Sequence, residues 1–126
     1  MDDNRRSFFR VSMRLAEARA TGISEGRASR FIIRLIDLSA GGSLILSPRS
    51  LKVSDAVRLH LPSAPGHDAI DLPGRIVRTE LIGKEWRVAV QFTSLSDADR
   101  DRIVRRVMYE ELRQGVVASG VSSSSG

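Results

Sequence analysis

The sequence has no cysteine, and this absence excludes disulfide bonds and thiol chemistry. It also has no apolar run near the roughly 18 residues that a membrane-spanning helix needs. Arginines and acids interrupt the N-terminal stretch throughout, so it lacks the apolar core of a signal peptide. These absences favour a cytoplasmic protein without a membrane span.

Histidines and aromatic residues are also scarce, which limits the chemistry that the chain can perform. The two histidines, His60 and His67, do not have a metal-binding spacing, so we expect no metal site. Ser39 has neither a neighbouring histidine nor a G-x-S-x-G context, and the chain contains no phosphate-binding loop. We therefore expect no enzyme and no cofactor. Among the few aromatic residues, Trp86 and Phe92 are predicted to lie in the core.

Arginine, by contrast, is abundant. Only Lys52 and Lys84 are lysines, so 18 of the 20 basic residues are arginines, and the formal net charge is +5. The guanidinium group binds phosphates and guanine edges through paired hydrogen bonds, so this bias favours an anionic partner. A genome that prefers arginine codons would also explain it. The length of 126 residues fits one compact domain.

The hydrophobic pattern up to residue 92 predicts short strands. Apolar residues alternate with polar ones, or form short runs bounded by glycine and proline. The predicted strands cover residues 10–20, 29–37, 43–47, 56–61, 69–82 and 86–92. We expect the first turn at Gly22 and Gly26, and a kink or bulge at Pro73-Gly74 in the long fifth strand.

The pattern changes to a helical period after Ser96. Ser96 and Asp99 have the spacing of a capping box, so one amphipathic helix is predicted over residues 97–113. The residues of its expected apolar face are Ile103, Val104, Val107, Met108 and Leu112. The arginines expected mostly on the opposite side are Arg102, Arg105, Arg106 and Arg113.

Several short strands followed by one helix predict an all-β fold with one helix. We expect a six-stranded antiparallel β-barrel plus a C-terminal α-helix over residues 10–113, in which closure of the barrel removes exposed strand edges. Residues 1–9 show no strand alternation and are predicted to form a flexible arm. Residues 114–126 are rich in serine and glycine and are predicted to form a disordered tail.

The stretch NRRSFFR, residues 4–10, places Arg5, Arg6 and Arg10 ahead of the first predicted strand, with no acid among them. Such a cluster can act as a clamp for an anion. The structural alternative is a solvated, fraying chain end. Phe8 and Phe9 either pack the arm against the barrel or line a ligand site.

A second motif, IDLSAGG at residues 36–42, places Asp37, Ser39 and Gly42 in the spacing D-x-S-x-x-G. A carboxylate and a hydroxyl at a strand end can converge on one polar ligand. Gly41 and Gly42 would let the backbone approach closely and adopt positive φ. The structural alternative is a turn capped by the Asp and Ser side chains.

Together, R-x-x-x-R at Arg6 and Arg10 and the later D-x-S-x-x-G resemble the signature of the PilZ domain family. The segment WRVAVQF, residues 86–92, is similar to the family's late strand, with Ala89 where the family often has glycine. The resemblance covers residues 5 to about 113 and implies the same barrel and helix that the pattern predicts.

The resemblance also implies a receptor for the bacterial second messenger cyclic di-GMP. The residues that it implies as ligand contacts are Arg5, Arg6, Arg10, Asp37, Ser39, Gly41 and Gly42. Arg87 is a candidate for one further contact. An arginine at the place of Arg5 is associated in the family with two intercalated ligand molecules per chain. Ligand binding would order the arm and signal to a downstream protein partner.

Two other functions fit parts of the sequence. A small basic barrel that binds nucleic acid would account for the charge. A PilZ-like adaptor in pilus assembly would share the fold without binding the ligand, although the intact arginine and D-x-S-x-x-G motifs argue against that role.

Overall fold

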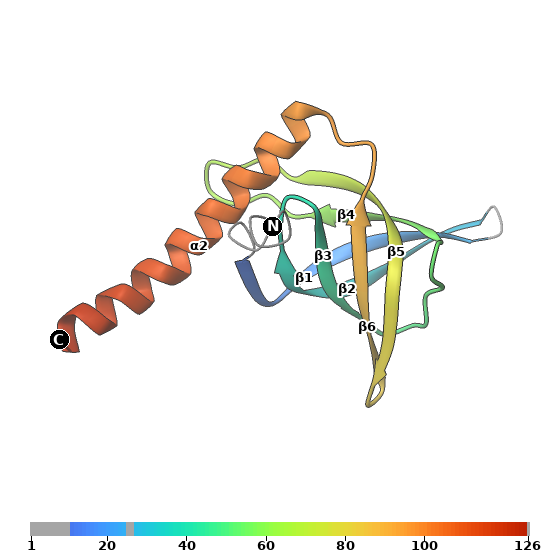
Figure 1. The fold of residues 1–126 in the computed structure, drawn as a ribbon, viewed down its shortest axis with the longest axis horizontal. Helices are drawn as coiled ribbons and strands as arrows, with labels where there is room; N and C mark the ends of the chain where they lie inside the picture. The colour runs from blue at the N-terminus through green and yellow to red at the C-terminus, as the bar shows by residue number, and fades with distance from the viewer. Residues whose placement is uncertain (1–10, 25–26, 126) are drawn as a thin grey trace, which may run out of the picture.

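Six antiparallel strands close into a barrel in the computed structural model, in the order β1-β2-β3-β6-β5-β4 (Figure 1). The structure describes the backbone of residues 11–24 and 27–125 and the side chains of residues 17–23 and 27–113. The strands are β1 (Val11–Ser24), β2 (Arg27–Leu38), β3 (Gly42–Ser47), β4 (Ala56–Leu61), β5 (Ile70–Ile82) and β6 (Glu85–Phe92). The predicted six-stranded barrel with a C-terminal helix is confirmed.

Two local expectations about the strands are wrong. Gly22 lies inside β1, which runs on to Ser24. The irregularity of β5 lies at Val77, between Ile76 and Arg78, whereas Pro73 and Gly74 keep regular pairing with β4. Gly74 is needed for close packing instead, because a Cβ there would lie 2.6 Å from Val90 Cγ1.

The barrel interior is filled by alternating apolar side chains from all six strands, because successive residues of a strand point to opposite faces. Those with 0% exposure are Ala20, Leu38, Ile45, Leu59, Leu72 and Val88, together with Ile103 of the helix. Phe92 is buried as expected, whereas Trp86 is half-buried and packs against the core from its rim.

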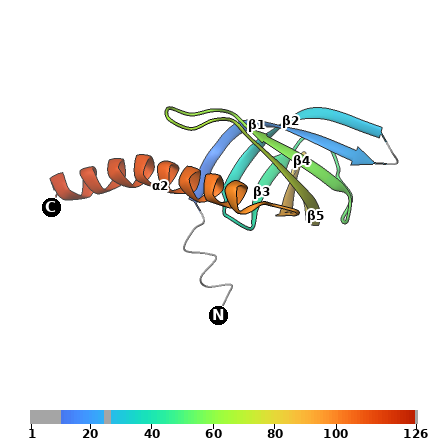
Figure 2. The ribbon, with the colours of Figure 1, turned by 90° about the horizontal axis from the view of Figure 1, so that it is seen from above.

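The helix α2 (Asp97–Ser125) follows the last strand and begins with the predicted capping box. Asp99 N donates to Ser96 Oγ at 3.1 Å, and Ser96 N donates to Asp99 Oδ2 at 3.3 Å. Ile103 and Val107 enter the core, while the C-terminal half of α2 extends beyond the barrel (Figures 1 and 2). The helix continues past its predicted end at residue 113 and runs to Ser125.

The side of α2 that faces the barrel differs from the prediction. Arg106 and Glu110 are buried, at 3% and 5% exposure, whereas Met108 and Leu112 are 50% and 63% exposed. Arg106 and Glu110 lie four residues apart on one face of the helix and form an ion pair. The opposite charges offset much of the free-energy cost of burying each charged group. Within the described part of the chain, no helix is both long and apolar enough to cross a bilayer.

Candidate ligand-binding groove

All four residues predicted from IDLSAGG come together where β2 turns into β3. Asp37, Ser39, Gly41 and Gly42 line an open groove with a volume of about 350 Å³. Strands β5 and β6 complete its wall with Arg78, Ala89 and Gln91, among others. The groove therefore lies on the outside of the barrel, over the β3–β6–β5 part of the sheet.

Hydrogen bonds within the motif hold this turn in place. Leu44 N donates to Asp37 Oδ1 at 3.0 Å, and Ser43 Oγ donates to the Asp37 carbonyl at 2.6 Å. Ser39 donates to the Gly42 carbonyl from both its backbone N, at 2.9 Å, and its Oγ, at 3.2 Å. Asp37 and Ser39 therefore do cap this turn, as the structural alternative predicted. One oxygen of the Asp37 carboxylate already accepts a hydrogen bond from Leu44 N.

Gly42 is required for the close approach of two strands. A Cβ on Gly42 would lie 2.2 Å from the Val90 carbonyl oxygen of β6, a distance that no side chain can adopt. Phe92 N donates to the Gly41 carbonyl at 2.9 Å, which fixes the same turn against β6. The expectation of positive φ at Gly41 and Gly42 is wrong, because among the described glycines only Gly66 and Gly83 have positive φ.

Arg78 is a groove residue that the sequence analysis missed. It pairs with Ala89 of β6 directly after the bulge at Val77, and both Val77 and Arg78 are exposed along the groove. Its guanidinium group forms no hydrogen bond or ion pair with any of the described side chains. The break in alternation within the sequence GRIVRTE was the available signal, because a bulge places two successive residues on one face.

Arg87, the candidate for a further contact, lies on β6 but does not line the groove. Its guanidinium group pairs with Glu80 of β5. Arg5, Arg6 and Arg10 lie outside the described residues, so their contact with the groove stays a prediction. No group of three metal-ligating side chains is found among the residues that the structure describes.

Sequence comparison then identifies the family. The model of the PilZ domain matches residues 4–109, which include both the arginine motif and the D-x-S-x-x-G motif. The chain belongs to the PilZ domain family. PilZ domains form a family of cyclic di-GMP receptors and adaptors that bind rather than catalyse. No curated protein gives a significant sequence match.

Solved PilZ structures share the fold. YcgR from Escherichia coli in complex with c-di-GMP has a TM-score of 0.71 at 16% identity, over 89% of this chain and 48% of YcgR. The isolated PilZ domain of YcgR with c-di-GMP has a TM-score of 0.66 at 17% identity, over 87% and 94% of the two chains. The K. pneumonia MrkH–c-di-GMP complex has a TM-score of 0.65 at 14% identity, over 87% of this chain and 53% of MrkH. This chain therefore spans about half the length of YcgR and MrkH.

Proposed function

We propose that this PilZ protein is a cytoplasmic receptor for cyclic di-GMP. The observation that supports the proposal most strongly is the groove, because Asp37, Ser39, Gly41 and Gly42 of one family motif line it together. The other motif, with Arg6 and Arg10, lies within the matched family range. Two similar folds, YcgR and MrkH, have been solved in complex with c-di-GMP.

The chemistry of the groove suits a cyclic dinucleotide. Guanine presents O6 and N7 as a pair of acceptors that an arginine fork matches, and its N1–H and exocyclic N2 amino group suit a carboxylate such as Asp37. The two phosphates need cationic donors, which Arg6, Arg10 and the exposed Arg78 would supply. Arg78 is thus proposed as a contact from the opposite wall of the groove.

We also propose that two intercalated ligand molecules bind to each chain. Two such molecules bring four phosphates together, and Arg5 would add a third guanidinium group beside Arg6 and Arg10. The arm of residues 1–9 would become ordered over the groove when the ligand neutralises its arginines. The composite surface of arm, ligand and barrel would then be recognised by a downstream protein partner.

Titration calorimetry with cyclic di-GMP, GTP and a single-stranded oligonucleotide, each at several salt concentrations, tests the proposal. We expect saturable binding of cyclic di-GMP with two molecules per chain, and one per chain in Arg5→Leu. An unchanged ratio of one in both proteins would contradict the stoichiometry alone. Preference for the oligonucleotide, with the steep salt dependence of phosphate binding, would favour a nucleic-acid function instead. No binding of either ligand would leave the adaptor role.

A further inference from the structure

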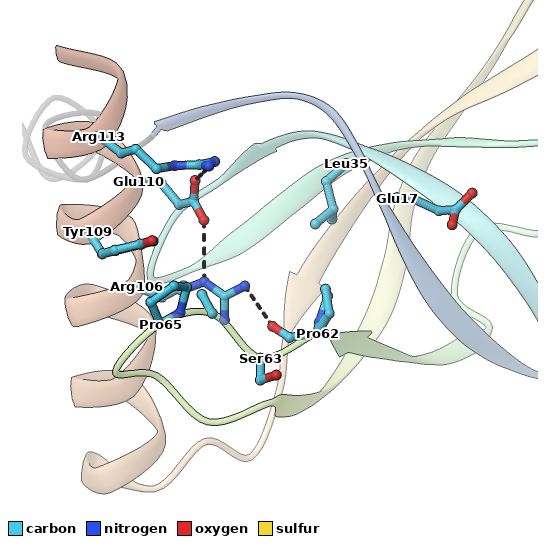
Figure 3. Close-up of a pocket in the computed structure, with 10 residues that line it drawn as sticks. Glu17, Leu35, Pro62, Ser63, Pro65, Arg106, Tyr109, Glu110 and Arg113 are labelled. Carbon is cyan, nitrogen blue, oxygen red and sulfur yellow. Dashed lines mark hydrogen bonds and ion pairs between the residues drawn. The ribbon is translucent and has the colours of Figure 1, made fainter. Parts of the chain in front are cut away.

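The two ends of the barrel differ in how their charges are balanced. At the end covered by α2, Arg106 donates hydrogen bonds to Glu110 and to the Pro62 carbonyl (Figure 3). Arg113 also donates to Glu110, and this hydrogen bond raises the pKa of Arg113. With Glu17, these side chains line a cavity of about 240 Å³, and their positive and negative charges cancel. The charge at this end is therefore neutralised within the protein.

The opposite end of the barrel carries basic side chains without partners. Strand pairing places the β1–β2 turn, the loop after β3 and the β5–β6 turn at this end, whereas α2 begins at the other end (Figure 1). Lys52 and Lys84, the only lysines of the chain, lie in the β3–β4 loop and the β5–β6 turn. Both are exposed, and neither ammonium group bonds to a described residue. We call this end the loop end; its described residues are Ile23, 27–30, 48–55 and 81–85.

A pocket at the loop end brings two cations together. It has a volume of about 150 Å³ and lies between the β1–β2 hairpin and the β3–β4 loop. The charged residues that line it are Arg49, Lys52 and Asp55, so its net charge is +1. One positive charge suits the single negative charge of a phosphodiester better than it suits a dianion.

The Arg49 side chain is already oriented in this pocket. Its Nη1 donates to Ser29 Oγ at 3.0 Å, and its guanidinium carbon lies 4.3 Å from the centre of the Phe31 ring. The other two nitrogens, Nε and Nη2, form no hydrogen bond with any of the described residues. Arg49 is exposed, so a phosphate oxygen can reach these donors from solvent.

The loop that carries Lys52 is fastened to the barrel at its tip. Asp55 N donates to the Lys52 carbonyl at 3.1 Å and closes a turn with Val53 and Ser54 at its centre. Ser54 N donates to the Ile76 carbonyl of β5 at 2.7 Å, and Ile76 N donates to the Asp55 carbonyl at 3.0 Å. Val53 is therefore held at the tip of a fixed turn, where it is 54% exposed.

Exposed aliphatic side chains gather at the same end. Half of the large apolar side chains that are exposed in the described part of the chain lie there: Ile23, Val53, Leu81 and Ile82. They occupy three separate tips, which a planar bilayer can contact together (Figure 1). Aliphatic residues beside basic ones are typical of surfaces that bind anionic membranes. No aromatic side chain is exposed among the described residues of the loop end, so base stacking has no platform there.

We propose that the loop end binds an anionic membrane surface. Arg49 and Lys52 hold the phosphodiester of one phospholipid such as phosphatidylglycerol, while Ile23 and Val53 enter the layer of headgroups beside it. The inference goes beyond the proposed cyclic di-GMP function, because no residue that lines this pocket lines the groove. The turn of Gly41 and Gly42 lies at the other end of β3, so the groove stays open in the membrane-bound protein.

Vesicle sedimentation with the full chain, in the absence of cyclic di-GMP, tests the proposal. We expect the protein to sediment with vesicles of phosphatidylcholine and phosphatidylglycerol in equal amounts, and to stay in solution with phosphatidylcholine alone. High salt should weaken the binding, because it screens the charges. Equal sedimentation with both kinds of vesicle, or with neither, would overturn the proposal. Retention of a duplex oligonucleotide by protein that binds no vesicle would assign the basic end to nucleic acid instead.

Two variants separate the pocket from the total charge of the protein. Lys52→Gln should weaken binding to the mixed vesicles about fivefold, the contribution of one basic residue near an anionic surface. Arg100→Gln, exposed near the start of α2, removes the same charge and should keep the binding. Val53→Ser should weaken it about threefold by removing inserted methyl groups, whereas Leu112→Ser on α2 should not. Equal losses in Lys52→Gln and Arg100→Gln would overturn the proposal.

Discussion

Gly42 and Val90 lie so close together that a Cβ on Gly42 would meet the Val90 carbonyl oxygen at 2.2 Å. We expect Gly42→Ala to push β3 away from β6 and to lower both stability and affinity for cyclic di-GMP. Overpacking of this kind costs about 1–3 kcal/mol. Thermal denaturation and calorimetry on the same sample measure the two effects. Wild-type protein is the reference. A melting temperature and an affinity for cyclic di-GMP equal to those of the wild type would contradict the role given to Gly42.

Asp37 is expected to contribute to both stability and binding. Asp37→Ala removes the acceptor of Leu44 N and should cost about 1 kcal/mol of stability together with ligand affinity. Asp37→Asn keeps an acceptor oxygen for Leu44 N but loses the charge, so it should restore most of the stability and little of the affinity. A variant pair in which stability falls while the affinity of the folded fraction stays unchanged would assign Asp37 to the turn alone.

The arm arginines are expected to dominate ligand affinity. Arg6→Ala or Arg10→Ala should weaken cyclic di-GMP binding by about tenfold to a hundredfold, since each removes charge-assisted hydrogen bonds of about 1.5–3 kcal/mol. Arg10→Lys should also fail, because an ammonium group cannot form the paired contacts of the fork. Calorimetry measures the affinities. Wild-type affinity in both alanine variants would refute the assignment.

Arg78 should contribute a smaller amount from the other wall of the groove. Arg78→Gln removes an exposed cation and is expected to weaken binding about three- to tenfold, more at low salt than at high salt. Arg75→Gln is the matched control, because Arg75 is exposed on the same strand but does not line the groove. If both variants lose the same affinity, the effect is one of total charge and Arg78 is not a contact.

The buried pair on α2 gives a prediction for stability. Glu110→Ala should cost about 3–5 kcal/mol, because it leaves the buried Arg106 guanidinium without its counter-charge. Asp101→Ala, which breaks the exposed Asp101–Arg105 pair four residues apart, should cost about 0.5 kcal/mol at most. Denaturant titration measures both. The double variant Arg106→Met/Glu110→Met should recover most of the loss, and failure to do so would show that packing, not charge, is responsible.

The sequence predicted the barrel well because alternation depends directly on which strand face is buried, as Val57, Leu59 and Leu61 show in β4. It placed the start of the helix correctly through the Ser96–Asp99 box, but it misplaced the end of the helix and its buried face. A hydrophobicity pattern predicts charged residues such as Arg106 and Glu110 to lie on the surface. The tertiary structure shows that they are buried together as an ion pair.

The candidate groove was predicted in part. Asp37, Ser39, Gly41 and Gly42 are adjacent in the chain, so one motif was enough to find them. Arg78 is distant in sequence, and its place depends on the bulge at Val77 and on the pairing of β5 with β6. Contacts between segments that are far apart in the chain depend on the register of strand pairing, and no pattern of neighbouring residues in the sequence reveals that register.

The closure of the barrel also sets an order of events when the chain folds. Thr21 Oγ1 and His60 Nε2, 39 residues apart, lie 2.9 Å from each other across the β1–β4 seam. Ile103 and Val107 then complete the core from a helix that is synthesised after all six strands. Such non-local pairings slow folding because loop closure must come first. The first strand emerging from a ribosome must therefore wait for most of the chain before its inner face is covered.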